Sequence, residues 1–276
     1  MVDEKIFALC ETITESEIAN LNGDFLSNIK EDGDRILAIA KDGEVLLMNR
    51  RGLIKNKQFR EVVEELTNIA REHPNFIIDG EIIAENGEFN LLSSRAGTQN
   101  KHKIAELEKT IPILYMVFDI LSLDNVDLRA KPLKERILEL GKLIFSQQGE
   151  IKNRVRYCKY GTITDMLFKA KSEQLEGIVI KDMNAPYESR RSKNWLKLKL
   201  KTEKVVEFSK YETNNKGLRL SDEQDNAIQM SRIDLISRIV NEIKTKGKIA
   251  IECECLEIFD TGKMRQPVFK RIVGDA

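Results

Sequence analysis

Residues 35–49, RILAIAKDGEVLLMN, constrain the fold of this chain more than any other stretch. Two apolar runs flank Asp42 and Gly43, and an Asp-Gly pair is the turn chemistry that two-residue β-hairpin loops favour. We therefore predict two antiparallel strands that are joined at this turn. A chain built around such a hairpin suits an antiparallel α+β fold better than a regular βαβ alternation.

The other expected elements are of mixed type. Residue periodicity predicts helices at 57–73, 132–145 and 162–174, and strands at 75–92, 111–121, 176–182 and 194–200. The run 111–121 is continuously apolar, which suits a buried central strand. Either Thr162 or Thr164 is expected to cap the third helix. Because strands outnumber helices, we expect an α+β domain with mixed or antiparallel sheets.

The composition changes after about residue 204. Short strand-like runs follow at 205–212, 216–222, 226–231 and 248–259, with one amphipathic helix at 232–245. About 70 residues with several short strands and one helix suit a five-stranded OB barrel. We therefore predict two domains, residues 1–203 and residues 204–276.

Composition narrows the class of protein. Of the 276 residues, 41% are hydrophobic, which is ample for a core, and 45 basic residues balance 45 acidic ones. Any surface for a polyanion must therefore come from local basic clusters, such as 101–103, 189–193 and 197–204. The four cysteines are too scattered for a disulfide framework or zinc pairs, and no apolar stretch suits a signal peptide or a membrane span. These features predict a cytoplasmic protein without a membrane anchor.

A chemical motif precedes the hairpin. Lys30, Asp32, Gly33 and Arg35 form the pattern K-x-D-G-x-R. A lysine attacks phosphorus only when it is deprotonated, and a nearby positive charge such as that of Arg35 favours the loss of the proton. Gly33 permits a tight turn and a close approach to a ligand. Taken alone, however, the pattern more often marks a turn beside a salt-bridged lysine.

Five downstream stretches change this interpretation. They are NRRG (49–52), IIDGEIIA (77–84), YMVFDIL (115–121), LEGIVIKD (175–182) and NWLKLK (194–199). Together with K-x-D-G-x-R, and in the same order, they resemble the motifs of ATP-dependent DNA ligases, which are members of the covalent nucleotidyltransferase superfamily. The resemblance extends from residue 25 to the end of the chain. It implies a nucleotidyltransferase (adenylation) domain over 1–203 and an OB-fold domain over 204–276.

The resemblance also implies a mechanism that uses ATP and a divalent ion, Mg²⁺ or Mn²⁺. Lys30 would attack the α-phosphorus of ATP, the AMP would pass to the 5′-phosphate at a nick, and the 3′-hydroxyl would displace it. Lys30 is thus the expected catalytic residue. The expected nucleotide-binding residues are Ile29, Arg35, Arg50, Glu81, Phe118, Arg191, Lys197 and Lys199, and the expected metal ligands are Glu81 and Glu176.

These positions also have structural interpretations. By pattern alone, Phe118 is a core aromatic residue within an apolar strand. Lys197 and Lys199 share one strand face, where two lysines are more often solvated, although as a pair they would hold the α-phosphate and place positive charge near Lys30. Arg51 is an alternative to Arg50 for the contact with the nucleotide.

Two features depart from the family pattern. Asn28 stands where many DNA ligases have a glutamate, which puts the adenine contact in question, although an amide can also accept a hydrogen bond. The ending RQPVFKRIVGDA lacks a clear R-x-D-K motif. Asp275 is a candidate remnant of that motif, and Lys270 and Arg271 are candidate substitutes for the basic groups that orient pyrophosphate.

The resemblance further implies a biological role. About 25 residues precede the first motif, so we expect a minimal two-domain, monomeric ligase that acts on nicked duplex DNA. DNA repair is the expected setting, with end joining beside a Ku-type end-binding protein and a repair polymerase as its specific form, and a 3′-ribonucleotide as a candidate preference at the nick. The alternatives are an RNA ligase of the same superfamily and a non-catalytic, OB-containing nucleic-acid-binding protein.

Overall fold

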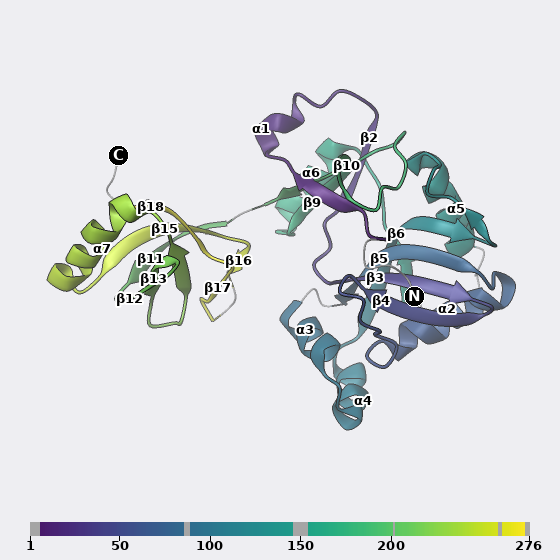
Figure 1. Ribbon diagram of the computed structural model, residues 1–276, viewed down its shortest axis with the longest axis horizontal. Coiled ribbons are helices and arrows are strands. Elements are labelled where there is room, and N and C mark those ends of the chain that lie inside the picture. Colours follow the sequence, from purple (N-terminus) through teal and green to yellow (C-terminus); the bar gives the residue numbers. More distant parts are fainter. Residues whose placement is uncertain (1–5, 86–88, 146–153, 201, 259–260, 274–276) are drawn as a thin grey trace. The chain divides into compact units, whose positions relative to one another are not determined.

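The computed structural model describes residues 6–85, 89–145, 154–200, 202–258 and 261–273. It divides into two compact units, residues 1–198 and 199–276, which are described separately (Figure 1). The division falls five residues before the predicted boundary after residue 203. The reason is that strand β11 (Thr202–Phe208) pairs along its whole length with β15 (Ile249–Cys255) of the second unit.

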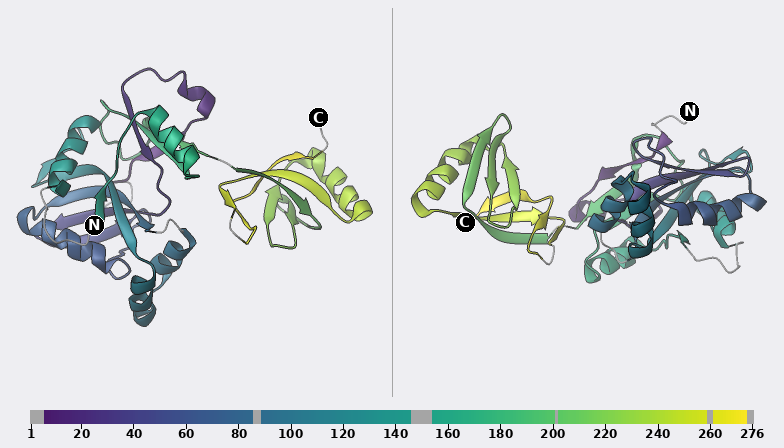
Figure 2. Two further views of the ribbon diagram at one scale, coloured as in Figure 1. Left: turned by 180° about the vertical axis from the view of Figure 1, so that it is seen from behind. Right: turned by 90° about the horizontal axis from the view of Figure 1, so that it is seen from below.

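The larger sheet of the first unit is mostly antiparallel. Among the described residues its strand order is β4-β3-β5-β6-β7, and β8 pairs in parallel with β6. The same sheet is seen from behind and from below in Figure 2. The strands are β3 (Asp34–Lys41), β4 (Glu44–Asn49), β5 (Phe76–Ala84), β6 (Ile113–Leu123), β7 (Val126–Asp127) and β8 (Val155–Tyr157). The central, buried strand predicted at 111–121 is β6.

The hairpin predicted from 35–49 is confirmed. Strands β3 and β4 pair antiparallel from Ile36 with Asn49 to Lys41 with Glu44. Asp42 and Gly43 connect them with φ angles of 51° and 85°. Two successive residues in the left-handed region define the type I′ turn that matches the twist of paired strands.

A second, smaller sheet carries the nucleophile candidate. Its strand order is β1-β10-β9-β2, with bounds β1 (Leu9–Thr12), β2 (Phe25–Ile29), β9 (Gly177–Asp182) and β10 (Arg191–Lys199). Strands β2 and β9 run antiparallel, and Ile29 lies opposite Ile178. Lys30 therefore follows directly at the end of β2, beside the start of β9.

The described helices of the first unit are α1 (Glu15–Ile18), α2 (Arg60–Glu72), α3 (Phe89–Gly97), α4 (Lys101–Thr110), α5 (Leu133–Phe145) and α6 (Ile163–Ser172). Thr162 is the N-cap of α6, and its side chain accepts a hydrogen bond from the backbone N of Asp165 at 3.1 Å. The strand predicted through residue 92 is wrong, because β5 ends at Ala84 and α3 follows. Leu92 and Ala96, four residues apart, are buried in the core as one helical face.

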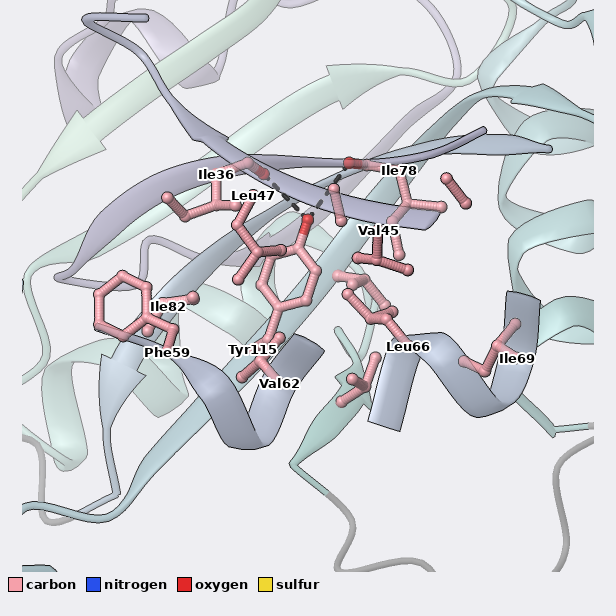
Figure 3. Packing of buried hydrophobic residues seen from close by; sticks show 14 of the residues in the cluster. Ile36, Val45, Leu47, Phe59, Val62, Leu66, Ile69, Ile78, Ile82 and Tyr115 are labelled. Carbon is pink, nitrogen blue, oxygen red and sulfur yellow. Dashed lines mark hydrogen bonds between the residues drawn. The ribbon is translucent and has the colours of Figure 1, made fainter. Parts of the chain in front are cut away.

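The main core of the first unit lies between the larger sheet and its helices. Figure 3 shows Val62 and Leu66 of α2 next to Tyr115, whose ring stands beneath the sheet. The Tyr115 hydroxyl lies 2.9 Å from the carbonyl oxygen of Ile36 and 3.2 Å from that of Ile78, so its proton can be donated to either (Figure 3). A buried phenol that is paired in this way joins β6 to β3 and β5 without leaving an unsatisfied polar group.

The second unit is the predicted β-rich module with one helix. Among its described residues, β11-β15-β18 and β12-β13-β14 form two three-stranded sheets, and β16 pairs with β17. Apolar residues of both sheets and of α7 form its core. The remaining bounds are β12 (Lys210–Asn214), β13 (Gly217–Ser221), β14 (Ala227–Met230), α7 (Ile233–Lys246), β16 (Glu257–Ile258), β17 (Met264–Arg265) and β18 (Val268–Ile272).

Two general features of the chain bear on the sequence predictions. No helix in the described ranges combines the length and the apolar character that a membrane crossing requires. The cysteines at positions 10, 158, 253 and 255, all within the described ranges, form no disulfide, and all but Cys10 are buried.

Candidate active site

Lys30 and Glu176 form an ion pair at the junction of β2 and β9. Lys30 Nζ donates to Glu176 Oε2 at 2.5 Å, and the backbone N of Lys30 donates to the carbonyl of Gly177 at 2.9 Å. The two side chains are 21% and 7% exposed. Lys30 Nζ is therefore held in one position while it stays accessible from solvent. Glu176 Oε2 can accept a proton that Nζ releases.

Arg35 is held by hydrogen bonds to two other segments of the chain. Its guanidinium donates to both carboxylate oxygens of Asp79, at 3.1 and 2.6 Å, and to the carbonyl of Ala8 at 2.6 Å. Tyr187 also donates its hydroxyl proton to Asp79, at 2.7 Å. Bidentate, charge-assisted bonds of this kind fix the side chain firmly. Asp79 was not among the predicted site residues, although its two-residue spacing from Glu81 places both on one face of β5.

Glu81 lies opposite Arg35 in the pairing of β5 with β3. Burial raises the pKa of its carboxyl to about 8, and the positive charges of Arg35 and Lys30 only partly oppose this shift. Glu81 also lines a cavity of about 900 Å³, together with Gly33, Asp34, Arg35, Arg50, Arg51 and Lys55. The predicted residues Arg35, Arg50 and Glu81, and the alternative Arg51, thus share one cavity.

The raised pKa of Glu81 predicts a pH-dependent stability. In the folded protein this carboxyl holds its proton up to about pH 8, whereas its ordinary pKa is 4.5. Its contribution to the free energy of unfolding is therefore complete below about pH 4.5 and decreases as the pH rises through 8. Relative to Glu81→Gln, the wild type is expected to lose stability between pH 5 and 9.

Urea unfolding of both proteins tests this expectation, with the fluorescence of Trp195, the single tryptophan, as the signal for the first unit. Glu44→Gln removes an exposed carboxyl of the same sheet and serves as the control. A difference between wild type and Glu81→Gln that stays constant from pH 5 to 9 would contradict the assignment.

Phe118 lies in a cluster of aromatic rings that surrounds a buried lysine, Lys181. Its ring meets Trp195 edge to face, with centroids 5.9 Å apart. Lys181 Nζ lies 4.3 Å from the Phe118 centroid and 4.0 Å from that of Trp195, and it donates to the Tyr160 hydroxyl at 2.8 Å. Burial lowers the pKa of Lys181 to about 8. Cations over aromatic faces are attracted to the ring quadrupole, so Phe118 and Trp195 stabilise this ammonium.

The predicted residues of β10 lie along one strand. Trp195, Lys197 and Lys199 alternate along β10, so their side chains leave the same face, and both lysines are half-buried. Arg191 begins the strand, and its guanidinium donates to the carbonyl of Cys10. The structure thus places Lys197 and Lys199 on the same face of β10 as Trp195, whereas the Arg191 guanidinium is hydrogen-bonded to the backbone of β1.

Asn28 and Ile29 are the last two residues of β2 and directly precede Lys30. Ile29 is half-buried and its carbonyl accepts a hydrogen bond from Asn28 Nδ2 at 2.7 Å. Within the described residues, the buried Oδ1 of Asn28 has no hydrogen-bond partner. A buried acceptor without a hydrogen-bond partner costs free energy of folding. Rotation of the amide by half a turn would present its NH₂ group in place of its oxygen. Asn28 therefore holds a polar group that a ligand could satisfy.

The candidate metal ligands are the carboxyl groups of Glu81, on β5, and of Glu176, which immediately precedes β9. Among the described residues, no group of three or more His, Cys, Asp or Glu side chains is arranged to hold a metal ion. Glu81 and Glu176 are both close enough to Lys30 to interact with it electrostatically. Two carboxylates fit a magnesium ion that takes its remaining ligands from phosphate and water.

Lys270 and Arg271, the candidate substitutes in the C-terminal motif, form ion pairs within the second unit. Lys270 Nζ lies 2.6 Å from Glu203 Oε1 and 3.3 Å from Glu252 Oε1, and Arg271 donates to Glu252. Glu252 and Arg271 face each other across the pairing of β15 with β18. Asp275, the candidate remnant, lies outside the described residues.

Comparisons with known proteins agree with this architecture. The family model of the ATP dependent DNA ligase domain matches residues 8–199. A DNA ligase of Saccharolobus islandicus (strain L.S.2.15 / Lassen #1) is 28% identical over 209 residues, which are 73% of this chain and 34% of that relative. The chain thus spans about a third of the length of the curated relatives it matches.

Solved structures extend the likeness to both units. The fold is similar to a Lig E DNA ligase (TM-score 0.68, 15% identity, 99% of this chain and 100% of that one) and to the mycobacterial DNA ligase D complexed with ATP and MES (0.60, 16%, 100% and 97%). The predicted fold class, a nucleotidyltransferase domain followed by a small OB fold, is confirmed. The chain belongs to the family of the ATP dependent DNA ligase domain.

Proposed function

We propose that this protein is an ATP-dependent DNA ligase that seals nicks between a 5′-phosphate and a 3′-hydroxyl in duplex DNA. The observation that carries the proposal is the pair formed by Lys30 and Glu176, in which a partly exposed Nζ is held 2.5 Å from a carboxylate oxygen. Family membership supports the same reaction. Because the chain matches only part of its longer relatives, the activity is assigned here on the geometry of the chain itself.

Lys30 acts as the nucleophile. The neutral Nζ forms a bond to the α-phosphorus of ATP, the bond from that phosphorus to the bridging oxygen breaks, and pyrophosphate leaves. The proton released from Nζ has an acceptor in Glu176. In the second step the 5′-phosphate at the nick displaces lysine from the AMP, and in the third the 3′-hydroxyl attacks that 5′-phosphate and releases AMP. Such transfers depend mainly on positioning and on neutralisation of charge.

The nucleotide lies between the two sheets in this proposal. Phe118 stacks on adenine. Because Lys181 Nζ already lies over the Phe118 ring, adenine either occupies the other face of the ring or displaces the lysine. Asn28 Oδ1 accepts a hydrogen bond from the base. Ile29 contributes to the base pocket. Lys197 and Lys199 meet the α-phosphate from β10.

The remaining predicted contacts concern the ribose, the phosphates and the metal. Arg35, Arg50 and Arg191 are proposed to face the ribose or the phosphates, and Glu81 the ribose. Glu81 and Glu176 would hold Mg²⁺ or Mn²⁺, and the chemistry that the ion would supply there is neutralisation of the negative charge that develops on pyrophosphate. We propose a monomeric, cytoplasmic enzyme of DNA repair, with end joining beside a Ku-type protein and a repair polymerase as its setting.

A sealing assay with matched nicked duplexes tests the function. Purified protein with ATP and Mg²⁺ is expected to convert a nicked DNA duplex to a sealed strand, and to form an AMP-capped 5′-phosphate when the 3′-hydroxyl is absent. Parallel substrates carry a ribonucleotide or RNA on the 3′ side, which measures the proposed preference. Equal sealing of single-stranded RNA would favour an RNA ligase, and tight DNA binding without any AMP transfer would favour a non-catalytic binding protein.

A further inference from the structure

The cavity that Arg50 and Glu81 line extends beyond the residues assigned to the nucleotide. Its far side is formed by the loop after β4 and by α3, with Lys55 in its wall. Lys55 is 6% exposed, and its Nζ donates to the carbonyl of Ala96 at 2.8 Å. Within the described part of the chain, no carboxylate lies within ion-pair distance of this ammonium; Asp34, which lines the same cavity, interacts with it only at longer range. Because an ammonium has three donors, Lys55 keeps hydrogen-bonding capacity toward the cavity.

The loop that carries Lys55 is held in one conformation. Asn49 Oδ1 accepts the backbone N–H groups of Arg51 and Leu53, both at 3.0 Å, and the backbone N of Lys55 donates to Leu47 at 2.9 Å. Gly52, with a φ of 74°, permits the turn. Preorganised donors cost little entropy when a ligand binds, so this loop is suited to recognition.

The chemistry of the loop indicates a polyanion with an apolar part. Arg50 and Arg51 are exposed at the cavity, and Leu53 and Ile54 beside them are 52% and 49% exposed. Alternating phosphates and sugars present such a surface, whereas free pyrophosphate has no apolar part. Moreover, Lys197 and Lys199, proposed to hold the α-phosphate, lie on β10 of the other sheet.

We propose that Lys55, with Arg51 at the rim, forms a subsite for a backbone phosphate of the nicked DNA, separate from the phosphates of ATP. This inference rests on the proposed function and specifies where the first unit binds nicked DNA, the substrate that follows ATP. Lys55 contributes one positive charge at a fixed position in the cavity wall. Its loss weakens binding of the nick without altering the formation of the lysyl-AMP.

Lys55→Gln tests the subsite, since the amide removes the charge but still offers a donor to Ala96. Lysyl-AMP formation with ATP is expected to stay within about twofold of wild type. The Kd of the adenylylated enzyme for a nicked duplex is expected to rise about tenfold, and the slope of log Kd against log salt to fall by about one. Lys57→Gln, an exposed lysine of the same loop, serves as the control and leaves both quantities unchanged.

Three results would overturn the subsite. They are an equal loss of lysyl-AMP formation and of DNA binding, no change in DNA binding, and an unchanged salt slope. Lys55→Arg restores the charge and is expected to restore the Kd. Should Lys55→Gln fail to fold, Arg51→Gln at the exposed rim is expected to show the same change in Kd and salt slope. A wild type that forms lysyl-AMP but binds no nicked duplex refutes the subsite, whereas one that forms no lysyl-AMP refutes the proposed function itself.

Discussion

With ATP and Mg²⁺, Lys30→Arg is expected to form the enzyme-AMP adduct at a rate at least roughly 10³-fold lower than wild type, so that no adduct is detected. A guanidinium keeps the positive charge beside Glu176 but does not lose its proton in proteins, so it offers no lone pair to the α-phosphorus. The intact mass of the protein after incubation with ATP is the measurement. Wild type should gain the mass of one AMP, and the variant should not.

The choice of arginine separates chemistry from stability. Lys30→Met would remove the ammonium that pairs with the 7% exposed Glu176 carboxylate and thereby destabilise the first unit. Lys30→Arg keeps that pair, so its unfolding midpoint by Trp195 fluorescence should match wild type. Lys169→Arg, on the exposed surface of α6, should retain full adduct formation. An adduct that persists in Lys30→Arg would remove Lys30 as the nucleophile.

Arg136→Met is expected to lower the free energy of unfolding of the first unit by about 3–5 kcal/mol. Arg136 and Asp119 are both 0% exposed, and the guanidinium donates to the two carboxylate oxygens at 2.8 and 2.9 Å. It also donates to the carbonyls of Lys131 and Ala185, at 2.6 and 3.1 Å. Removing it leaves the buried Asp119 charge without its cation and takes away one donor from each of the two carbonyls, although Ala185 keeps the backbone N–H of Leu133 at 3.0 Å. Because Asp119 follows Phe118, the proposed adenine contact should weaken as well.

An exposed pair provides the matched control. Arg129 and Asp127 form a similar contact at 2.6 Å with side chains that are 46% and 56% exposed. Arg129→Met should cost less than about 1 kcal/mol, because solvent screens such pairs. Urea unfolding followed by Trp195 fluorescence measures both variants. The double variant Arg136→Met with Asp119→Leu should recover part of the lost stability, because it removes the buried charge as well. Equal losses of stability in Arg136→Met and Arg129→Met would contradict the prediction, since they would show that burial does not increase the contribution of the ion pair.

Local periodicity was sufficient for much of the fold. The Asp42-Gly43 turn, the apolar strand β6 and the helix α6 each depend on residues that lie close together in the chain, and each is predicted by the sequence. For the cap of α6, the sequence leaves Thr162 and Thr164 as alternatives, and the structure has Thr162. Helix α3 was missed because its buried face is spaced over Leu92 and Ala96, and the second of these lies beyond the apolar stretch that suggested a strand.

Tertiary partners explain what the sequence left out of the site. Motif order indicates Lys30 and Glu176 as candidates, but no local pattern indicates that Arg35 is bound by Asp79 and Ala8 from distant segments. Lys181 was likewise overlooked, since a lysine at the end of an apolar strand is usually solvated. Its burial becomes apparent only when β6 and β10 bring their rings together.

The long separation of Lys30 from Glu176 has a consequence for synthesis of the protein. The two residues are 146 positions apart, and β9 has to pair with β2 before they meet. At about 5–20 residues per second, the ribosome adds the intervening segment in roughly 7–30 s. During that interval the nascent chain carries the proposed nucleophile without its carboxylate. If Lys30 is the nucleophile as proposed, the chain can react with ATP only after almost all of the first unit has been translated.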